Sequence, residues 1–205
     1  EDIWEVNDNG EVVNRIKDKS KDAFYRVGAD GKRLEGEGNV ITFKYGTIKE
    51  RNHKVETTNG EKTMKIFEVK GDENASKTFN FLIGGNGSEK VEWGHVKIGN
   101  EGSGRNLIGT TNEKESSYME GYALAFNYTI RESNHNHPGG PTIPSEADVN
   151  GAKSVSDKFK NATFNIFENP NEPVPYNKNS DYIKPIYPGA RVGKLTPGKK
   201  WWNNE

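Results

Sequence analysis

The chain has 205 residues, of which 31% are hydrophobic and 29% charged, and it contains no cysteine. Its 29 basic and 30 acidic residues leave a formal net charge of -1, so no global field favours nucleic acid or an anionic membrane as partner. The absence of cysteine excludes disulfides, thiol catalysis and cysteine-ligated zinc. No apolar run approaches the roughly 20 residues of a membrane-spanning helix, so we expect a soluble protein.

The first 72 residues predict a leader module rich in β-hairpins. Asn9-Gly10 and Asp30-Gly31 are two-residue turn signals between short apolar segments, and Asn59-Gly60 is a third. The expected strand pairs are residues 4–6 with 12–16, 23–27 with 32–34, and 40–45 with 62–69. This module carries no evident catalytic chemistry.

Residues 73–205 predict a second domain in which strands and helices alternate. Apolar residues at helical spacing indicate helices over 75–83, 114–127 and 145–160, the first of them stopped by Gly84-Gly85. The expected strands are 91–98, 106–108, 128–134, 162–167 and 182–187. This order predicts a mixed α/β fold with a proline-rich C-terminal tail.

Two of the four histidines in the chain lie in one short stretch. In a strand His135 and His137 point to the same face, because side chains alternate. The Pro138-Gly139-Gly140 segment ends that strand, and Ser145 begins the next helix. Two imidazoles from a strand end and the Asp148 carboxylate from the first helical turn can therefore converge, as in a catalytic zinc site with one open position.

Each part of this pattern also has an ordinary structural interpretation. Ser145-x-x-Asp148 is close to a capping box at a helix N-terminus. A His-x-His pair on a strand is more often a surface pair than a ligand pair. The two patterns together, at this spacing and across a Pro-Gly-Gly turn, predict zinc binding.

The pattern His135-x-His137-x7-Ser145-x-x-Asp148 resembles the JAMM motif of the JAB/MPN metalloproteases. The resemblance covers about residues 75–185 and is greatest to the JAB-like toxin domains at the C-terminal ends of secreted bacterial proteins. It implies an MPN/JAB-like (cytidine-deaminase-like) mixed sheet flanked by helices. It also implies a zinc-dependent peptidase or isopeptidase that hydrolyses an amide bond.

The resemblance further implies roles for individual residues. His135, His137 and Asp148 would bind Zn²⁺, and Ser145 would help to hold the oxyanion of the tetrahedral intermediate. The general base would be Glu92, on the expected strand 91–98 upstream of the histidines.

Two other glutamates are candidates for the general base. Glu89 is the alternative, because Glu92-Trp93-Gly94 places the first glycine one residue earlier than the family pattern does. Glu132 is disfavoured, since strand alternation places it opposite His135.

Partners and location follow from the same resemblance. We expect a protein or peptide substrate, including ubiquitin-like proteins, and an immunity protein as inhibitor, with no nucleic acid or membrane partner. The chain begins Glu1-Asp2-Ile3 without a signal pattern, so we expect a piece of a larger secreted or delivered protein. Two alternatives stay open: a metal nuclease of the His-Asn-His type, suggested by His135-Asn136-His137, and a non-catalytic MPN-like binding module.

Overall fold

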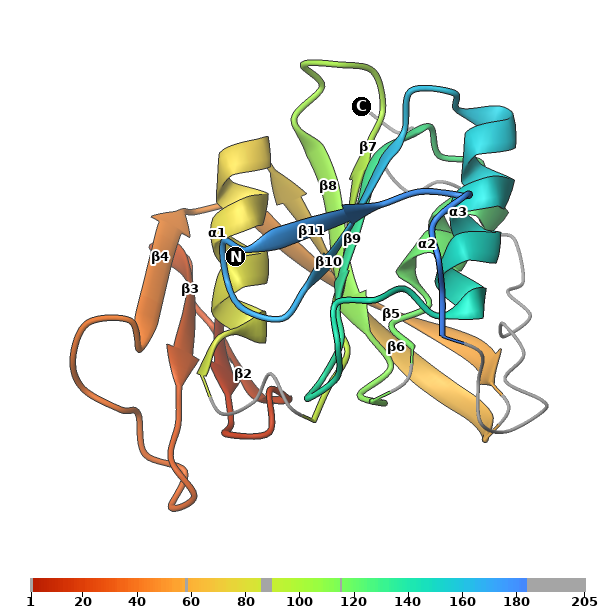
Figure 1. Ribbon diagram of the computed structural model, residues 1–205. Coiled ribbons are helices and arrows are strands. Elements are labelled where there is room, and N and C mark those ends of the chain that lie inside the picture. The colour runs from red at the N-terminus through yellow and green to blue at the C-terminus, as the bar shows by residue number, and fades with distance from the viewer. Residues whose placement is uncertain (1, 58, 86–89, 115, 184–205) are drawn as a thin grey trace.

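The structure is a computed structural model that describes residues 2–57, 59–85, 90–114 and 116–183. Over these residues it is a mixed α+β fold with two mixed sheets and three helices. Figure 1 shows a large central sheet with helix α1 on one side and helices α2 and α3 on the other. None of the described helices has the length and apolar character needed to cross a bilayer.

The smaller sheet contains the first four strands in the order β2-β1-β3-β4. The Asn9-Gly10 hairpin forms as expected, with antiparallel β1 and β2, and Gly10 adopts a φ of 81°. The four strands are β1 (Asp2–Val6), β2 (Val12–Lys17), β3 (Lys21–Arg26) and β4 (Val40–Lys44).

Of the other two expected strand pairs in this region, one forms in part and one is wrong. Residues 23–27 and 32–34 meet across the expected Asp30-Gly31 turn through an antiparallel bridge between Val27 and Arg33 and a bond from the Leu34 N–H to the Arg26 carbonyl at 2.9 Å. Strand β3 itself pairs with β1 in parallel and with β4. Strand β4 therefore does not pair with residues 62–69. Residues 62–69 belong to β6 (Gly60–Lys70), which instead forms a long hairpin with β5 (Ile48–Thr57) across the expected turn at Asn59-Gly60.

The larger sheet has seven strands in the order β11-β10-β9-β7-β8-β6-β5. Only the β9–β10 pair is parallel. Strands β5 and β6 precede residue 72 in the chain and are hydrogen-bonded into this sheet. The remaining strands are β7 (Gly94–Ile98), β8 (Arg105–Thr110), β9 (Ile130–Asn136), β10 (Thr163–Phe167) and β11 (Pro173–Tyr176).

Three helices cover the two faces of this sheet. Helix α1 (Asp72–Ile83) and helix α3 (Glu146–Lys158) lie close to their expected ranges. Helix α2 is confined to Met119–Ala125, because the chain before it forms a loop. The expected strand 182–187 lies outside the described residues from 184 onward, and Ile183 makes only an isolated bridge to Ser145.

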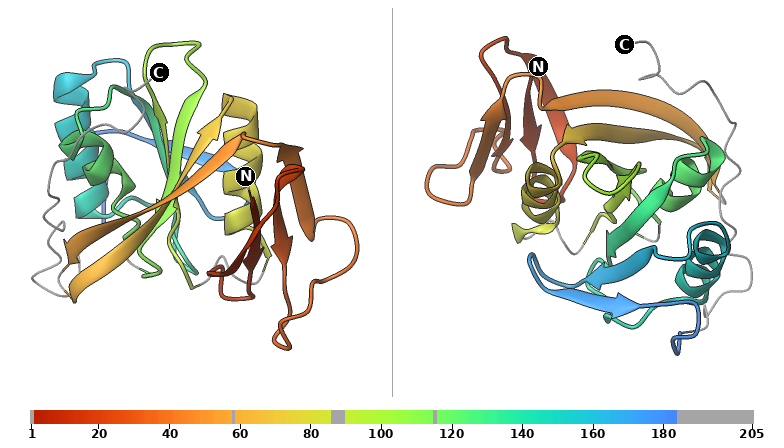
Figure 2. Two further views of the ribbon diagram at one scale, coloured as in Figure 1. Left: turned by 180° about the vertical axis from the view of Figure 1, so that it is seen from behind. Right: turned by 90° about the horizontal axis from the view of Figure 1, so that it is seen from above.

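Strands β6, β8 and β10 alternate their side chains between two hydrophobic cores. Leu107 packs into the core under α2 and α3, whereas its neighbour Ile108 packs into the core under α1. The α1 core also receives Trp4 and Phe24 from the smaller sheet, and the Trp93 indole nitrogen donates to the Gly10 carbonyl oxygen at 3.0 Å. Figure 2 shows the smaller sheet beside α1, at the opposite end of the molecule from α2 and α3.

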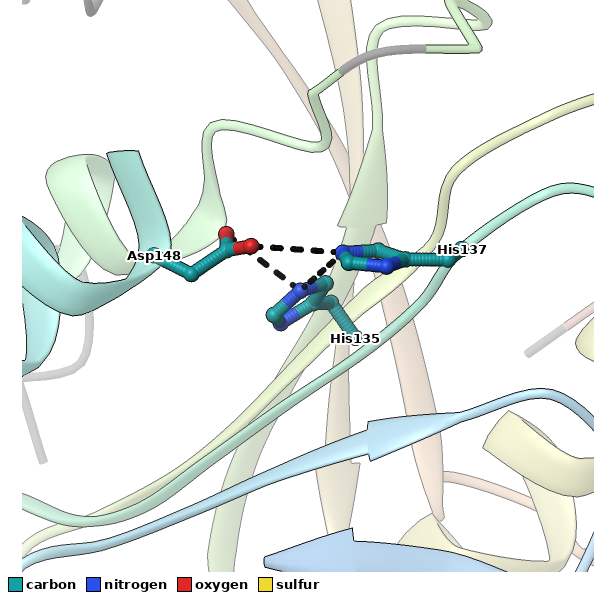
Figure 3. A group of neighbouring side chains, drawn as sticks. All are labelled: His135, His137 and Asp148. Carbon is teal, nitrogen blue, oxygen red and sulfur yellow. Dashed lines mark hydrogen bonds and ion pairs between the residues drawn. The ribbon is translucent and has the colours of Figure 1, made fainter. Parts of the chain in front are cut away.

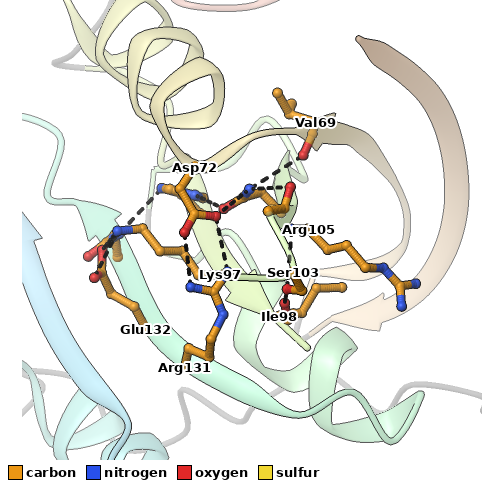
Figure 4. Close-up of polar contacts among 12 residues, drawn as sticks. Val69, Asp72, Lys97, Ile98, Ser103, Arg105, Arg131 and Glu132 are labelled. Atoms are coloured by element: carbon orange, nitrogen blue, oxygen red, sulfur yellow. Dashed lines mark hydrogen bonds and ion pairs between the residues drawn. The ribbon is translucent and has the colours of Figure 1, made fainter. Parts of the chain in front are cut away.

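A polar network fixes α1 to the larger sheet on the α1 side (Figure 4). The Asp72 carboxylate, in the first turn of α1, accepts hydrogen bonds at 3.0 Å from both terminal nitrogens of Arg131. Asn106 also donates to Asp72 and accepts from the buried His95 ring, while Asn134 donates to the other ring nitrogen of His95. Strand β9 is therefore held on this face by α1, β7 and β8, which leaves its other face to form the site.

Candidate metal centre

Strand β9 delivers the two histidines to the α2–α3 side of the sheet. His135 is the penultimate residue of β9, between Gly94 of β7 and Ile166 of β10, and only 7% of it is exposed. His137 follows directly after the strand, and its backbone N–H donates to the Phe167 carbonyl at 3.3 Å. The expected alternation holds, because the two Nε2 atoms lie 3.0 Å apart.

The turn after His137 determines which ring nitrogen faces the site. Gly139 has a φ of 59°, a left-handed conformation that favours glycine, and the chain folds back so that His137 Nδ1 lies 2.8 Å from the Pro141 carbonyl oxygen. A carbonyl only accepts hydrogen bonds, so Nδ1 carries the proton. The Nε2 lone pair of neutral His137 is then available to a metal.

Asp148 reaches the histidines from the first turn of α3. Ser145 is the N-cap, and its hydroxyl and backbone N–H both donate to Asp148 Oδ2 at 2.7 Å. The Asp148 N–H returns a bond to the Ser145 hydroxyl at 3.2 Å, which completes a capping box. The ordinary interpretation of Ser145-x-x-Asp148 is thus correct, and the same contacts orient the carboxylate toward both imidazoles.

The three side chains point toward one another and could hold a metal ion (Figure 3). His135 Nε2 lies 3.4 Å from Asp148 Oδ1, and His137 Nε2 lies 3.3 Å from Asp148 Oδ2. Ligand bonds of about 2.0–2.1 Å around tetrahedral zinc separate neighbouring ligand atoms by about 3.3 Å. Two imidazoles and one carboxylate are also a donor set of catalytic zinc, so His135, His137 and Asp148 could hold such an ion with one position open.

Electrostatics couple the members of the group. Burial disfavours the imidazolium form of His135, but Asp148, Glu92 and Glu120 outweigh that effect and raise the pKa of His135 to about 9. Burial likewise opposes ionisation of Asp148, yet the two histidines hold its pKa well below the usual range. A site that stabilises positive charge among carboxylates suits a cation.

Glu92 lies on the same side of the sheet as the histidines. It precedes β7 by two residues and is not inside a strand as expected, but the Asn136 N–H still donates to the Trp93 carbonyl at 3.3 Å. That contact continues the antiparallel register, so Glu92 lies across from His137. Its Oε1 accepts the Ser117 N–H at 2.9 Å, and burial raises its pKa although His135 lowers it.

The other glutamates considered for the base lie elsewhere. Glu132 faces the opposite side of β9, where its carboxylate binds Lys97 at 2.9 Å and accepts from Asn134 at 2.7 Å. Glu89 lies outside the described residues. Of these glutamates, the structure therefore brings Glu92 to the candidate metal-binding group, which consists of His135, His137 and Asp148.

Glu120 and Tyr176 also lie at the site, and sequence reasoning missed both. Glu120, on α2, is hydrogen-bonded by the Ser133 side chain, and burial raises its pKa to about 7. Its carboxylate packs so closely on Gly151 of α3 that a Cβ there would overlap it. The glycine inside a helical pattern was the available signal of this close approach.

Tyr176 reaches the site from the last residue of β11. Its ring meets His135 edge-on with centroids 5.9 Å apart. Burial and the charges of Glu120, Asp148 and Glu92 raise its pKa well above the ordinary value. It belongs to a proline-rich segment, where the sequence gives no periodic signal.

These side chains line one cleft of about 760 Å³ between α2, α3 and the end of β9. Its volume falls within the range of pockets that bind small molecules or peptide side chains. The wall holds the metal-binding group with Glu92, Glu120 and Tyr176, and the loop before α2 contributes Ser116, Ser117 and Tyr118. Tyr118 has a φ of 58°, which is rare for a bulky side chain and occurs where function or packing requires strain.

Comparison with known proteins identifies the domain. Residues 67–163 match the family model for JAB-like toxin 1, a segment that includes Glu92, both histidines and Asp148. Searches of curated proteins and of solved structures gave no significant match. The matched segment begins within β6 and ends at the first residue of β10. The chain therefore carries a JAB-like toxin domain over these residues.

Proposed function

We propose that this domain is a zinc-dependent peptidase or isopeptidase that hydrolyses an amide bond. The observation that carries the proposal is the placement of Glu92 in one cleft with His135, His137 and Asp148, whose candidate ligand atoms lie within 4.8 Å of one another. A buried carboxylate next to an open metal position is the arrangement of hydrolytic zinc enzymes.

The chemistry divides between the ion and the chain. Zinc at the three ligands would act as a Lewis acid and lower the pKa of its water to about 7. Glu92 would accept the proton that water loses as its oxygen attacks the amide carbon, and would return it to the leaving nitrogen. The Ser117 N–H holds the Glu92 carboxylate in one orientation, and burial, by raising its pKa, makes it a stronger base.

We further propose that the domain is the toxin or effector part of a larger secreted bacterial protein. The match to JAB-like toxin 1 supports this proposal. A protein or peptide substrate, including a ubiquitin-like protein, suits a cleft that is open to solvent and lined by polar and apolar side chains. Self-protection of a producing cell would require an immunity protein that blocks the same cleft.

The first experiment measures metal content. We expect one zinc ion per chain by plasma mass spectrometry, and its loss in His135→Ala and in Asp148→Ala. Purified protein without zinc that also fails to take up added zinc would refute the metal centre. Degradation of plasmid or RNA with magnesium would instead favour the nuclease alternative.

The second experiment separates catalysis from metal binding. Glu92→Gln should retain zinc and lose cleavage of ubiquitin-like or peptide substrates by about 100- to 10,000-fold, the usual range for a general base. Glu132→Gln is the matched control, because Glu132 lies on the opposite face of the sheet and binds Lys97. Equal cleavage by the wild type and Glu92→Gln contradicts the assignment, and zinc binding without any cleavage favours the binding module.

A further inference from the structure

The hydroxyl of Ser145 is already engaged in this structure. It has one hydrogen, which points to Asp148 Oδ2 at 2.7 Å, and its oxygen accepts the Asp148 N–H at 3.2 Å. Donating that hydrogen to a developing oxyanion would break a bond that orients a metal ligand. A tetrahedral intermediate in this cleft therefore needs another donor.

Tyr176 is placed to be that donor. The residue is 7% exposed, lines the same cleft as the metal-binding group, and lays its ring against the edge of His135 with centroids 5.9 Å apart. Within the described residues its hydroxyl makes no hydrogen bond. Tyr176 shares that cleft with the carboxylates of Glu92, Glu120 and Asp148.

The segment that carries Tyr176 holds the side chain in place. Tyr176 pairs with Phe164 across β10 and β11, and the two rings pack with centroids 5.7 Å apart. The Tyr176 hydroxyl is not among the buried polar atoms that lack a partner, so its oxygen is open to the cleft. A substrate oxygen in the cleft can therefore reach it.

We propose that Tyr176 is a catalytic residue that donates a hydrogen bond to the oxyanion of the tetrahedral intermediate; this assignment rests on the proposed amide hydrolysis. The water oxygen bonds to the amide carbon while its proton passes to Glu92, and the carbonyl π electrons move to the carbonyl oxygen. Tyr176 donates to that oxygen. Collapse of the intermediate restores the carbonyl and breaks the C–N bond, and the leaving nitrogen takes the proton from Glu92.

The test uses the full chain loaded with cobalt(II), whose visible absorption reports ligands at the metal. Inorganic phosphate is the tetrahedral oxyanion probe, and azide is a metal ligand without a tetrahedral array of oxygens. Tyr176→Phe should weaken phosphate binding about tenfold, the value of one hydrogen bond to a charged group, and leave azide binding within about twofold. Tyr182→Phe, at an exposed tyrosine, is the matched control and should change neither.

The outcomes separate this assignment from the proposed function. Phosphate that binds the wild type and Tyr176→Phe equally, or that does not bind the wild type, overturns the role of Tyr176. A chain that takes up no cobalt overturns the metal centre and Tyr176 with it. Tenfold selective loss of phosphate binding supports Tyr176 as an oxyanion donor, and failure to hydrolyse ubiquitin-like or peptide substrates alongside it counts against the proposed peptidase alone. With a cleaved substrate, Tyr176→Phe should lower kcat about 100- to 1000-fold at unchanged KM and zinc content.

Discussion

Replacing Ser145 with alanine removes two contacts at the start of α3. The variant loses the bond from the Asp148 N–H to the hydroxyl at 3.2 Å and the bond from the hydroxyl to Asp148 Oδ2 at 2.7 Å, and keeps only the backbone donor to that carboxylate. An N-cap is worth about 1 kcal/mol, and a hydrogen bond to a charged group about 1.5–3 kcal/mol. We expect about 2–3 kcal/mol of destabilisation and a melting temperature lower by about 5–10 °C.

The same variant should also bind zinc more weakly. Loss of a group that orients a metal ligand commonly costs about 10- to 100-fold in affinity. Competition with a chromophoric chelator measures the affinity, and calorimetry measures the melting temperature. Ser154→Ala is the matched control on α3, because the Ser154 hydroxyl bonds only the Asn150 carbonyl at an exposed position. A Ser145→Ala protein with wild-type melting and wild-type zinc affinity would refute the coupling of the cap to the ligand.

Three further predictions concern the scaffold. Burial lowers the pKa of His95 from 6.5 to about 4, so the unfolded state binds a proton at a higher pH than the folded state does. The free energy of unfolding should therefore fall by about 3 kcal/mol as the pH drops from 6.5 to 4. Urea titrations over this pH range should show a smaller loss of stability in His95→Gln. Removing residues 1–72 takes away β5, β6 and the hydrogen bond between Trp93 and Gly10, so the shortened chain should show no cooperative melting by circular dichroism. Cooperative melting of the shortened chain would instead support the expected domain boundary at residue 72. Gly151→Ala should displace the Glu120 carboxylate, because the added Cβ would overlap the far end of that side chain; a crystal structure of the variant with Glu120 unmoved would refute that contact.

The convergence of His135, His137 and Asp148 could be predicted because its geometry is local. Strand alternation places His135 and His137 on one face, and the capping pattern places Asp148 in the first turn of a helix that begins nearby. Helices α1 and α3 were close to their expected ranges for the same reason, since their apolar spacing and caps lie within the segment. The family resemblance was confirmed by the match over residues 67–163.

The wrong strand pair, residues 40–45 with 62–69, follows from non-local pairing. Strand β4 has several partners of similar pattern, and its alternation does not reveal that β3 is the one it joins. Strand β5 is an edge strand in which Ile48 and Val55 are the only fully buried residues, so it has little hydrophobic pattern. Strand β11 contains Pro173 and Pro175, which lie two residues apart and can both face away from β10, as an edge strand permits.

Glu120 and Tyr176 could not be found by spacing for a related reason. Glu120 reaches the cleft because α2 packs against α3 at Gly151, and Tyr176 reaches it because β11 is the antiparallel neighbour of β10. Both placements depend on contacts between elements that are far apart along the chain. A local pattern therefore identifies the metal ligands, whereas the groups around them depend on the tertiary fold.

The three ligands are held by three independent supports. His135 is enclosed between β7 and β10, His137 is oriented by the Pro141 carbonyl, and Asp148 is oriented by the Ser145 cap. None of these supports requires an ion, so the fold itself brings the candidate ligand atoms within 4.8 Å of one another. Metal binding should then cost little conformational entropy, because the side chains are already ordered. Loss of one support should loosen one ligand and leave the other two in place, and the zinc affinities of the variants should therefore fall in separate, partial steps.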